Sequence, residues 1–358
     1  MKQSSNYYIT YSASQITEGG QSRTAAFFRY FEKKDWNIIN VYAAGSKGRI
    51  LKMIKYIWFL YFVKNKTLFI HFGALVFLFS ASLINKPKVL RFFLTLLQRL
   101  AGNNKVIIEV NDLPFEQSID LGLPVEELYK KFQDGLFSIK NIHFIFASNT
   151  MEQYVSQNFH LKNTGSIING SNALEDSVMA PDYDWILSNT IKCIYAGTLN
   201  EGREIHSLIR LFKELKHITL VLMGGDGEWL KDESLPGNIK YIGSYPENIA
   251  QKIVSQCDLG IIHYDAGKFY YNLCYPTKAS FYIAAKIPFL STPLTELKNH
   301  FSNFEGAYFV EFDKWILFLD NITREILIKD KMSISRNYKR FTWPYLLSPL
   351  DNILKNPS

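Results

Sequence analysis

The sequence predicts an α/β protein with two doubly wound parallel sheets, because strand-like segments repeatedly end in a glycine turn that leads toward a helix. Ile191–Ala196, Ile218–Met223 and Ile239–Ile242 each stop at a glycine in this way. With 358 residues, of which 47% are hydrophobic, the chain can bury two cores of ordinary domain size. Ligands of such sheets bind beyond the carboxyl ends of the strands, so functional residues are expected there.

The first half of the chain contains six predicted strands. They are Tyr7–Ser12, Ile38–Ala43, Leu68–Phe72, Lys105–Val110, Phe144–Ala147 and Ser166–Asn169. Helical spacing of apolar residues predicts helices at Ser22–Lys33, from Ala74 and at Arg91–Leu100. Gly19 and Gly20 are predicted to form a turn before the first helix, where the backbone can approach a ligand, although a plain connecting turn is an alternative.

A membrane-spanning interpretation of the apolar run Leu68–Ile84 is disfavoured. The run contains His71, Gly73 and two serines, and its length is at the lower edge of the roughly 17–25 residues needed to span a bilayer. It is therefore interpreted as a buried strand followed by a helix.

The second half begins after a polar linker at Asn172–Asn189. Its further predicted strands are Asp258–His263 and Phe289–Ser291. Three helices are predicted: one that follows Arg203 and ends at Lys216, one at Pro246–Gln256 and one at Lys278–Ala285. Thr277 is expected to cap the helix at Lys278–Ala285. The N-terminus of such a helix attracts phosphate. Lys278 opposes the helix dipole unless an anion lies beside it, so it indicates an anion site; a solvated lysine is the alternative.

Six segments, taken in order, carry a family resemblance. They are TEGGQSRTAAFFRYF, IIEVNDLP, AGTLNEGRE, VLMGGDGEWL, YIGSYPENIAQKIVSQCDLGIIH and YPTKASFYIAAKIPFL. They resemble GT-B glycosyltransferases, which use nucleotide-activated sugars, and KASFY is most similar to bacterial adhesin-glycan glucosyltransferases and related galactofuranosyltransferases. The resemblance implies two Rossmann-like domains facing across a cleft: an acceptor-binding domain at 1–172, a nucleotide-sugar-binding domain at 173–340, and a helix at 341–358 that crosses back.

The implied activity is transfer of a hexose from a nucleotide diphosphate sugar, by resemblance a UDP-sugar, to a saccharide acceptor. Many retaining members carry two glutamates where Leu273 and Phe281 stand, so the ribose contact is expected from Ser280 or Asn272, and retention or inversion stays open. Arg203 is expected to neutralise the diphosphate. The expected donor-site residues are Gly19, Gly20, Thr198, Arg203, Gly225, Ile242, Asn272, Thr277, Lys278, Ala279 and Ser280.

Asp112 is the first candidate for the catalytic base, since it follows the predicted strand Lys105–Val110 directly. Glu109 and His71 are the second candidates. A carboxylate after a strand can also serve only as a turn or helix cap.

The net charge of +7 is unevenly divided, because residues 1–110 carry 16 Lys and Arg against 4 Asp and Glu. Lys47–Lys66 and Arg91–Leu100 mix basic with apolar residues and predict a surface for anionic lipid; a core-facing stripe with solvated lysines is the alternative. Nucleic acid is not expected, since no recognisable binding motif is present. Homo-oligomerisation is left open.

Cys193, Cys257 and Cys274 lack metal-like spacing, and the N-terminal residues lack the apolar core of a signal peptide. We expect a cytoplasmic enzyme, with the inner face of the cell membrane as an alternative location, that works without a metal ion or a cofactor. The rival interpretation is an inactive GT-B subunit or chaperone of a partner glycosyltransferase, and a sugar-phosphate epimerase is a third, less favoured interpretation.

Overall fold

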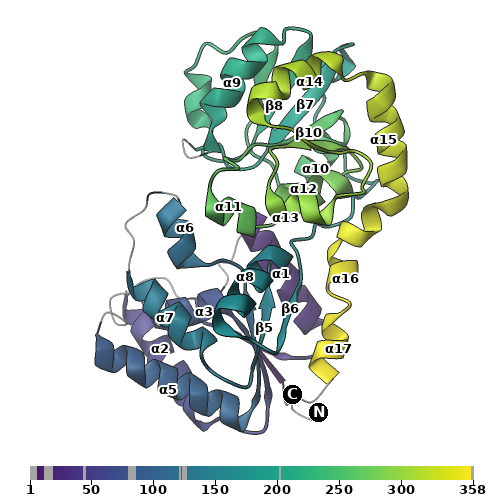
Figure 1. Cartoon of the computed structure of the whole chain (residues 1–358). Coiled ribbons are helices and arrows are strands. Elements are labelled where there is room, and N and C mark those ends of the chain that lie inside the picture. Colours follow the sequence, from purple (N-terminus) through teal and green to yellow (C-terminus); the bar gives the residue numbers. More distant parts are fainter. Residues whose placement is uncertain are drawn as a thin grey trace. The chain divides into compact units, whose positions relative to one another are not determined.

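The computed structural model describes residues 6–11, 19–42, 46–79, 86–120, 122, 127–200 and 203–355. The chain forms two compact units (Figure 1). The first comprises Met1–Ile16, Gln21–Ile168 and Leu347–Ser358, and the second comprises Thr17–Gly20 and Asn169–Leu346. Each unit contains a six-stranded parallel sheet flanked by helices, which confirms the predicted α/β class.

The sheet of the first unit has the strand order β2-β1-β3-β4-β5-β6. The strands are β1 (Asn6–Thr10), β2 (Asn37–Asn40), β3 (Thr67–His71), β4 (Lys105–Val110), β5 (Ile142–Phe146) and β6 (Thr164–Ser166). The helices are α1 (Gly19–Glu32), α2 (Ser46–Phe62), α3 (Phe72–Leu78), α5 (Pro87–Asn103), α6 (Pro114–Asp120), α7 (Glu127–Phe137), α8 (Asn149–Phe159) and α17 (Leu350–Lys355).

Aromatic side chains fill the core between α1 and the first sheet. Phe27 and Phe31 stand four residues apart on α1 and therefore share one face of the helix. Phe31 stacks on Tyr8 of β1 with ring centroids 4.6 Å apart, and Phe27 stacks on Phe69 of β3 at 5.5 Å. These contacts fix α1 over β1 and β3.

The last helix, α17, packs on the other elements of the first unit. Asp351 accepts a hydrogen bond from the Tyr30 hydroxyl and pairs with Lys34 at 2.7 Å. Lys105, the first residue of β4, donates from Nζ to the carbonyl of Ile353 at 2.7 Å. The C-terminal segment is therefore attached to both α1 and β4.

The sheet of the second unit has the strand order β12-β11-β10-β7-β8-β9. Its strands are β7 (Ile191–Ala196), β8 (Ile218–Met223), β9 (Ile239–Tyr241), β10 (Leu259–Ile262), β11 (Phe289–Ser291) and β12 (Ala307–Phe309). Its α-helices are α9 (Ile205–Glu214), α10 (Glu247–Ser255), α11 (Phe269–Leu273), α12 (Thr277–Ala284), α13 (Thr295–His300), α14 (Trp315–Asn321), α15 (Arg324–Asn337) and α16 (Trp343–Leu346). Short 3-10 helices cover Asp184–Leu187, Glu228–Lys231, Phe312–Lys314 and Tyr338–Phe341.

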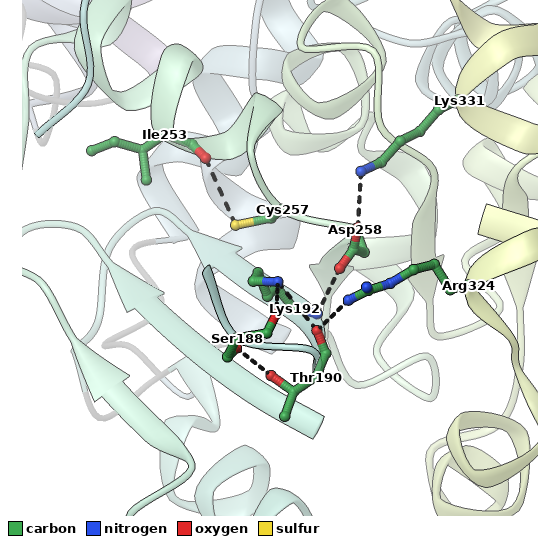
Figure 2. A network of polar contacts seen from close by, with 8 residues as sticks. All are labelled: Ser188, Thr190, Lys192, Ile253, Cys257, Asp258, Arg324 and Lys331. Carbon is green, nitrogen blue, oxygen red and sulfur yellow. Dashed lines mark hydrogen bonds and ion pairs between the residues drawn. The ribbon is translucent and has the colours of Figure 1, made fainter. Parts of the chain in front are cut away.

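A polar network occupies the amino edge of the second sheet (Figure 2). Asp258, just before β10, accepts a hydrogen bond from the Lys192 amide at 2.9 Å and pairs with Lys331 of α15 at 3.0 Å. Arg324 of α15 donates to the Thr190 carbonyl at 2.9 Å. Burial lowers the pKa of Lys192, although Asp258 opposes that shift. The network attaches α15 to the edge opposite the strand ends at which ligands are expected.

Several predicted element boundaries need correction. Gly19 and Gly20 are the first two residues of α1 and do not form a turn before it, since glycine is tolerated at a helix start. Residues 12–18, which precede them, lie outside the described residues. The strand predicted at Ser166–Asn169 is β6 at Thr164–Ser166, because its pairing with β5 ends at Ser166. No helix in the described ranges combines the length and the apolar character required to cross a bilayer.

Candidate functional site

The site residues of the second unit gather where its strand order reverses. Counting from β7, the order is 3-2-1-4-5-6, so the connections from β7 and from β10 leave in opposite directions. In open α/β sheets this reversal forms a crevice beyond the carboxyl ends of the two strands. By this rule the expected crevice of this unit lies between Gly197, which follows β7, and Tyr264, which follows β10.

Tyr282 of α12 fixes this helix over the crevice. Its buried hydroxyl accepts a hydrogen bond from the Ala196 amide at 2.9 Å and lies 3.0 Å from the carbonyl oxygen of Ile261. One phenol thereby bridges β7 and β10 beyond the residues at which the strands pair. Gly260 provides the space, because a Cβ there would lie 2.4 Å from the Tyr282 ring.

The start of α12 lacks a side-chain cap, so the predicted capping role of Thr277 is wrong. Pro276 occupies the cap position and Thr277 is already the first helical residue, which places its hydroxyl one position too late. The Ala279 amide donates to the Pro276 carbonyl at 3.1 Å, whereas the described residues offer no hydrogen-bond acceptor to the Thr277 and Lys278 amides. Two N–H groups at the positive end of a helix are therefore available to an anion.

The Lys278 side chain is buried and reaches from α12 to the end of β7. A Cβ on Gly197 would lie 2.8 Å from Lys278 Nζ. The ammonium group donates to the Tyr264 hydroxyl at 3.3 Å and lies 4.7 Å from the centroid of the Tyr195 ring. Within the described ranges no carboxylate pairs with Lys278, so this buried cation is held by aromatic rings and a phenol.

Arg203 provides a second cation at the same place. Its guanidinium lies 5.6 Å from the centroid of the Tyr264 ring. Burial acts to raise the pKa of Tyr264, but Lys278 and Arg203 lower the pKa overall. This shift records a local positive potential at the end of β10.

Glycines bring the backbone turns after β7 and β8 together. A Cβ on Gly224 would lie only 1.9 Å from the Gly197 carbonyl oxygen, and both glycines have a positive φ. The Gly224 amide in turn donates to the Gly243 carbonyl at 2.8 Å, and the Ile242 amide donates to the Leu222 carbonyl at 3.0 Å. The Ile242 carbonyl and the Gly243 amide have no backbone partner among the described residues, so both remain available for hydrogen bonding.

The remaining predicted donor residues have different environments. Thr198 is half-buried and its carbonyl accepts a hydrogen bond from the Tyr195 hydroxyl at 3.3 Å, while Gly225 is exposed. Ser280 is buried and donates to the Asn169 carbonyl at 2.6 Å. The Asn272 amide nitrogen donates to the carbonyls of Ala266 and Lys268, and its oxygen accepts from Thr295. A ribose contact from Ser280 or Asn272 would therefore compete with bonds that hold the fold.

The three candidate bases of the first unit lie on two neighbouring strand ends. His71 ends β3, Glu109 lies in β4, and Asp112 follows β4. Arg23 Nε donates to Glu109 at 2.6 Å, and His71 Nε2 lies 3.4 Å from the other Glu109 oxygen. Burial lowers the pKa of His71, although Glu109 opposes the shift. Asp112 is half-buried and accepts a hydrogen bond from Asn111 at 2.7 Å, so it is the most accessible of the three.

Solved structures with the same architecture are glycosyltransferases. Sucrose-phosphate synthase from Thermosynechococcus elongatus has a TM-score of 0.69 at 11% sequence identity, with 98% of each chain covered. Anabaena HepE in complex with UDP-glucose has a TM-score of 0.64 at 11% identity, also with 98% of each chain covered. The chain has the GT-B fold.

A longer GT-B protein matches over part of its length. The pneumococcal O-GlcNAc transferase GtfA, solved with UDP and GlcNAc, has a TM-score of 0.57 at 12% identity; the match covers 85% of this chain and 59% of that one. No family model and no curated protein sequence matches the chain. At such low identities the likeness establishes the GT-B fold alone.

The aromatic part of this GT-B site was not predicted from the sequence. Tyr195 and Tyr264 lie against Lys278, and Tyr271 packs on Tyr264 with ring centroids 4.9 Å apart. Tyr264 stands just beyond a strand end, the signal that singled out Asp112, and could have been found in the same way. Tyr195 lies inside β7, where an apolar core residue is the ordinary interpretation.

The described residues contain neither a metal-binding cluster nor a disulfide. Across the ranges that the structure describes, no cluster of three or more His, Cys, Asp or Glu side chains is arranged to hold a metal ion. Cys193, Cys257 and Cys274 are free thiols, and burial raises the pKa of the first two well above the ordinary value.

Proposed function

We propose that the chain is a glycosyltransferase that transfers a hexose from a nucleotide diphosphate sugar to a saccharide acceptor. The donor would bind to the second unit and the acceptor to the first. The observation that carries the proposal is the buried Lys278 ammonium beside the uncapped start of α12, where the strand order reverses. A diphosphate is the ligand chemistry that such a combination favours, because it accepts from backbone amides and pairs with cations.

The leaving nucleoside diphosphate is the group that the site would stabilise. Arg203, Lys278 and the first amides of α12 would oppose the charge that develops as the glycosidic bond breaks. UDP is the proposed nucleotide, supported by the UDP or UDP-glucose in the solved HepE and GtfA complexes. We further propose that these cations act without a metal ion, which predicts equal turnover with EDTA and with added magnesium.

Asp112 is the proposed catalytic base of the first unit. Glu109 is held by Arg23 and His71 is buried, whereas Asp112 is half-buried at the carboxyl end of β4. A general base must reach the acceptor hydroxyl, and the greater exposure of Asp112 supports assigning this role to it. Glu109 and His71 remain the alternatives if Asp112 is dispensable.

The acceptor is proposed to be a glycan or a lipid-linked or protein-linked saccharide of bacterial surface polysaccharide or glycoprotein synthesis, used at an anionic membrane surface in the cytoplasm. The basic character of residues 1–110 supports this part of the proposal. The rival is an inactive GT-B subunit that binds a partner glycosyltransferase, and it is favoured by the absence of glutamate at Leu273 and Phe281.

Release of nucleoside diphosphate from a panel of nucleotide sugars separates the two proposals. Thermal shift with each donor selects the sugars that bind, and product release is then measured with and without simple saccharide acceptors. Turnover that requires Lys278 supports the transferase. Donor binding without turnover under every condition, together with activation of a partner enzyme, would establish the rival.

A further inference from the structure

Helix α2 exposes a stripe of large apolar side chains. Leu51 is 70% exposed, Trp58 62% and Phe62 58%, and Ile54 is exposed on the same stripe. The rings of Trp58 and Phe62 stack with centroids 5.2 Å apart. These four residues, the α2 ridge, follow one another at spacings of three or four and therefore lie along one side of the helix.

The opposite side of α2 already provides the contacts that the core requires. Leu60 is buried, and Phe59 packs against Tyr7 of β1 with ring centroids 5.0 Å apart. The α2 ridge is therefore a second apolar face, additional to the one that folding uses. Contiguous exposed apolar surface of this kind marks an interaction site.

The chain segment that carries the α2 ridge has only basic charges. From residue 36 to residue 108 the chain contains eleven Lys and Arg and no Asp or Glu. Lys55 and Lys64 are exposed near the ridge, and on the adjacent helix α5 Arg99 lies 4.5 Å from the Tyr61 ring centroid. Phe92 of α5 adds another exposed aromatic ring.

An exposed apolar residue of α14 lies among acidic residues. Leu317 of α14 is 68% exposed, almost the same as Leu51, but Asp320 follows on the same helix and Glu325 lies in the first turn of α15. Apolar exposure alone therefore does not distinguish the α2 ridge. What distinguishes the α2 ridge is the combination of large exposed apolar side chains with basic residues and no acidic ones in the same chain segment.

We infer that the α2 ridge docks the first unit on an anionic lipid bilayer, with the ridge inserted among the acyl chains and the surrounding lysines and arginines on the headgroups. An interfacial helix with Trp, Phe and Leu on one face and basic residues around it binds membranes in this manner. The inference rests on the proposed function only for its purpose, which is to bring the acceptor site to a membrane-bound saccharide. Phe59 is not part of the α2 ridge, because it packs against Tyr7 of β1.

Vesicle flotation of the full chain tests the inference, with phosphatidylcholine vesicles that contain or lack phosphatidylglycerol. We expect binding only with the anionic lipid and a blue shift of the Trp58 emission, isolated as the difference between wild type and Trp58→Phe. Raising the salt from 0.15 M to 1 M shortens the Debye length from about 8 to about 3 Å. This change should weaken the binding to anionic vesicles without abolishing it, because the inserted apolar side chains are not screened by salt. The double variant Leu51→Ser/Phe62→Ser should bind about tenfold more weakly, while the matched control Leu317→Ser binds as wild type does.

Three results would overturn the inference: no binding to anionic vesicles at low salt, equal binding by the ridge variant and wild type, or tight binding of labelled single-stranded RNA without vesicle binding. Calorimetric binding of UDP by the same samples separates this outcome from the donor proposal. The ridge variant should retain wild-type UDP affinity, because Lys278 and Arg203 belong to the second unit. A wild-type chain that binds UDP but does not bind anionic vesicles would refute only the membrane inference.

Discussion

Replacement of Lys278 by methionine is the sharpest test of the donor site. Methionine replaces all of the lysine side chain except its terminal atom, and so removes the ammonium group that contacts the Tyr264 hydroxyl at 3.3 Å. A hydrogen bond to a charged group contributes about 1.5–3 kcal/mol, equal to roughly 10- to 150-fold in the dissociation constant of UDP. We expect Lys278→Met at the upper end and Arg203→Ala at the lower end of that range, since Lys278 is buried and Arg203 only half-buried.

Isothermal titration calorimetry with UDP gives the affinities, and two further measurements separate binding from folding. Lys278→Met should leave the thermal midpoint unchanged or raised, because it removes a buried charge. It should also raise the pKa of Tyr264, which the two cations lower, seen as a difference in tyrosinate absorbance at high pH. Lys286→Met is the matched control, since Lys286 Nζ also lies over a tyrosine ring, that of Tyr338, at 5.1 Å.

The combination of both substitutions refines the test. Two cations that act on one diphosphate should not contribute additively, so the double variant is expected to lose less affinity than the two single losses together. Wild-type affinity for UDP in both Lys278→Met and Arg203→Ala would refute the assignment of the phosphate site. A lower affinity in the Lys286 control would show that the effect is one of fold stability.

Three further outcomes are expected. Asp112→Asn should lower the transfer rate by about 10²–10⁴ with unchanged UDP affinity. The control Asp134→Asn, which removes an exposed ion pair with Lys130, should leave the transfer rate unchanged. A fully active Asp112→Asn variant would assign the catalytic base to His71 or Glu109. Gly224→Ala should lower the thermal midpoint by about 4–8 °C, because its Cβ would meet the Gly197 carbonyl at 1.9 Å, whereas Gly237→Ala has open space and should be neutral. Burial lowers the pKa of His263 from 6.5 to about 4. Between these pH values the unfolded chain therefore binds a proton that the folded chain does not. The contribution of His263 to the free energy of unfolding is fully present above pH 6.5, and up to about 3 kcal/mol of it is lost as the pH falls toward 4. Trp315, which contacts His263, reports the unfolding, and a His263→Phe variant with the same acid sensitivity as wild type would contradict the assignment.

The fold class and most strand positions follow from the sequence because they depend on local patterns. Apolar runs that end at turn residues form strands with the predicted bounds at Lys105–Val110, Ile191–Ala196, Ile218–Met223 and Phe289–Ser291. Helix starts were less accurate, as at Gly19 and Thr277, because which residue takes the cap position depends on how the chain enters the helix.

The lysine at the start of α12 could be singled out from the sequence, since a cation in a first turn conflicts with the helix dipole whatever its surroundings. Only the tertiary structure showed that its ammonium group is buried between Tyr195 and Tyr264, residues contributed by β7 and by the end of β10. Sequence distance carries no information about that proximity, which the reversal of strand order produces.

The sequence by itself determined the alternation of strands and helices, the basic character of residues 1–110 and the chemistry of Lys278, since each depends on residue type and spacing along the chain. The tertiary structure decided which of these residues meet. Strand order brings Gly197, Tyr264 and Lys278 into one crevice, and packing of α2 by its Leu60 side leaves Trp58 and Phe62 in solvent. The physical reason is that side-chain periodicity sets which faces are apolar, whereas only the packing of distant segments determines which apolar face is buried.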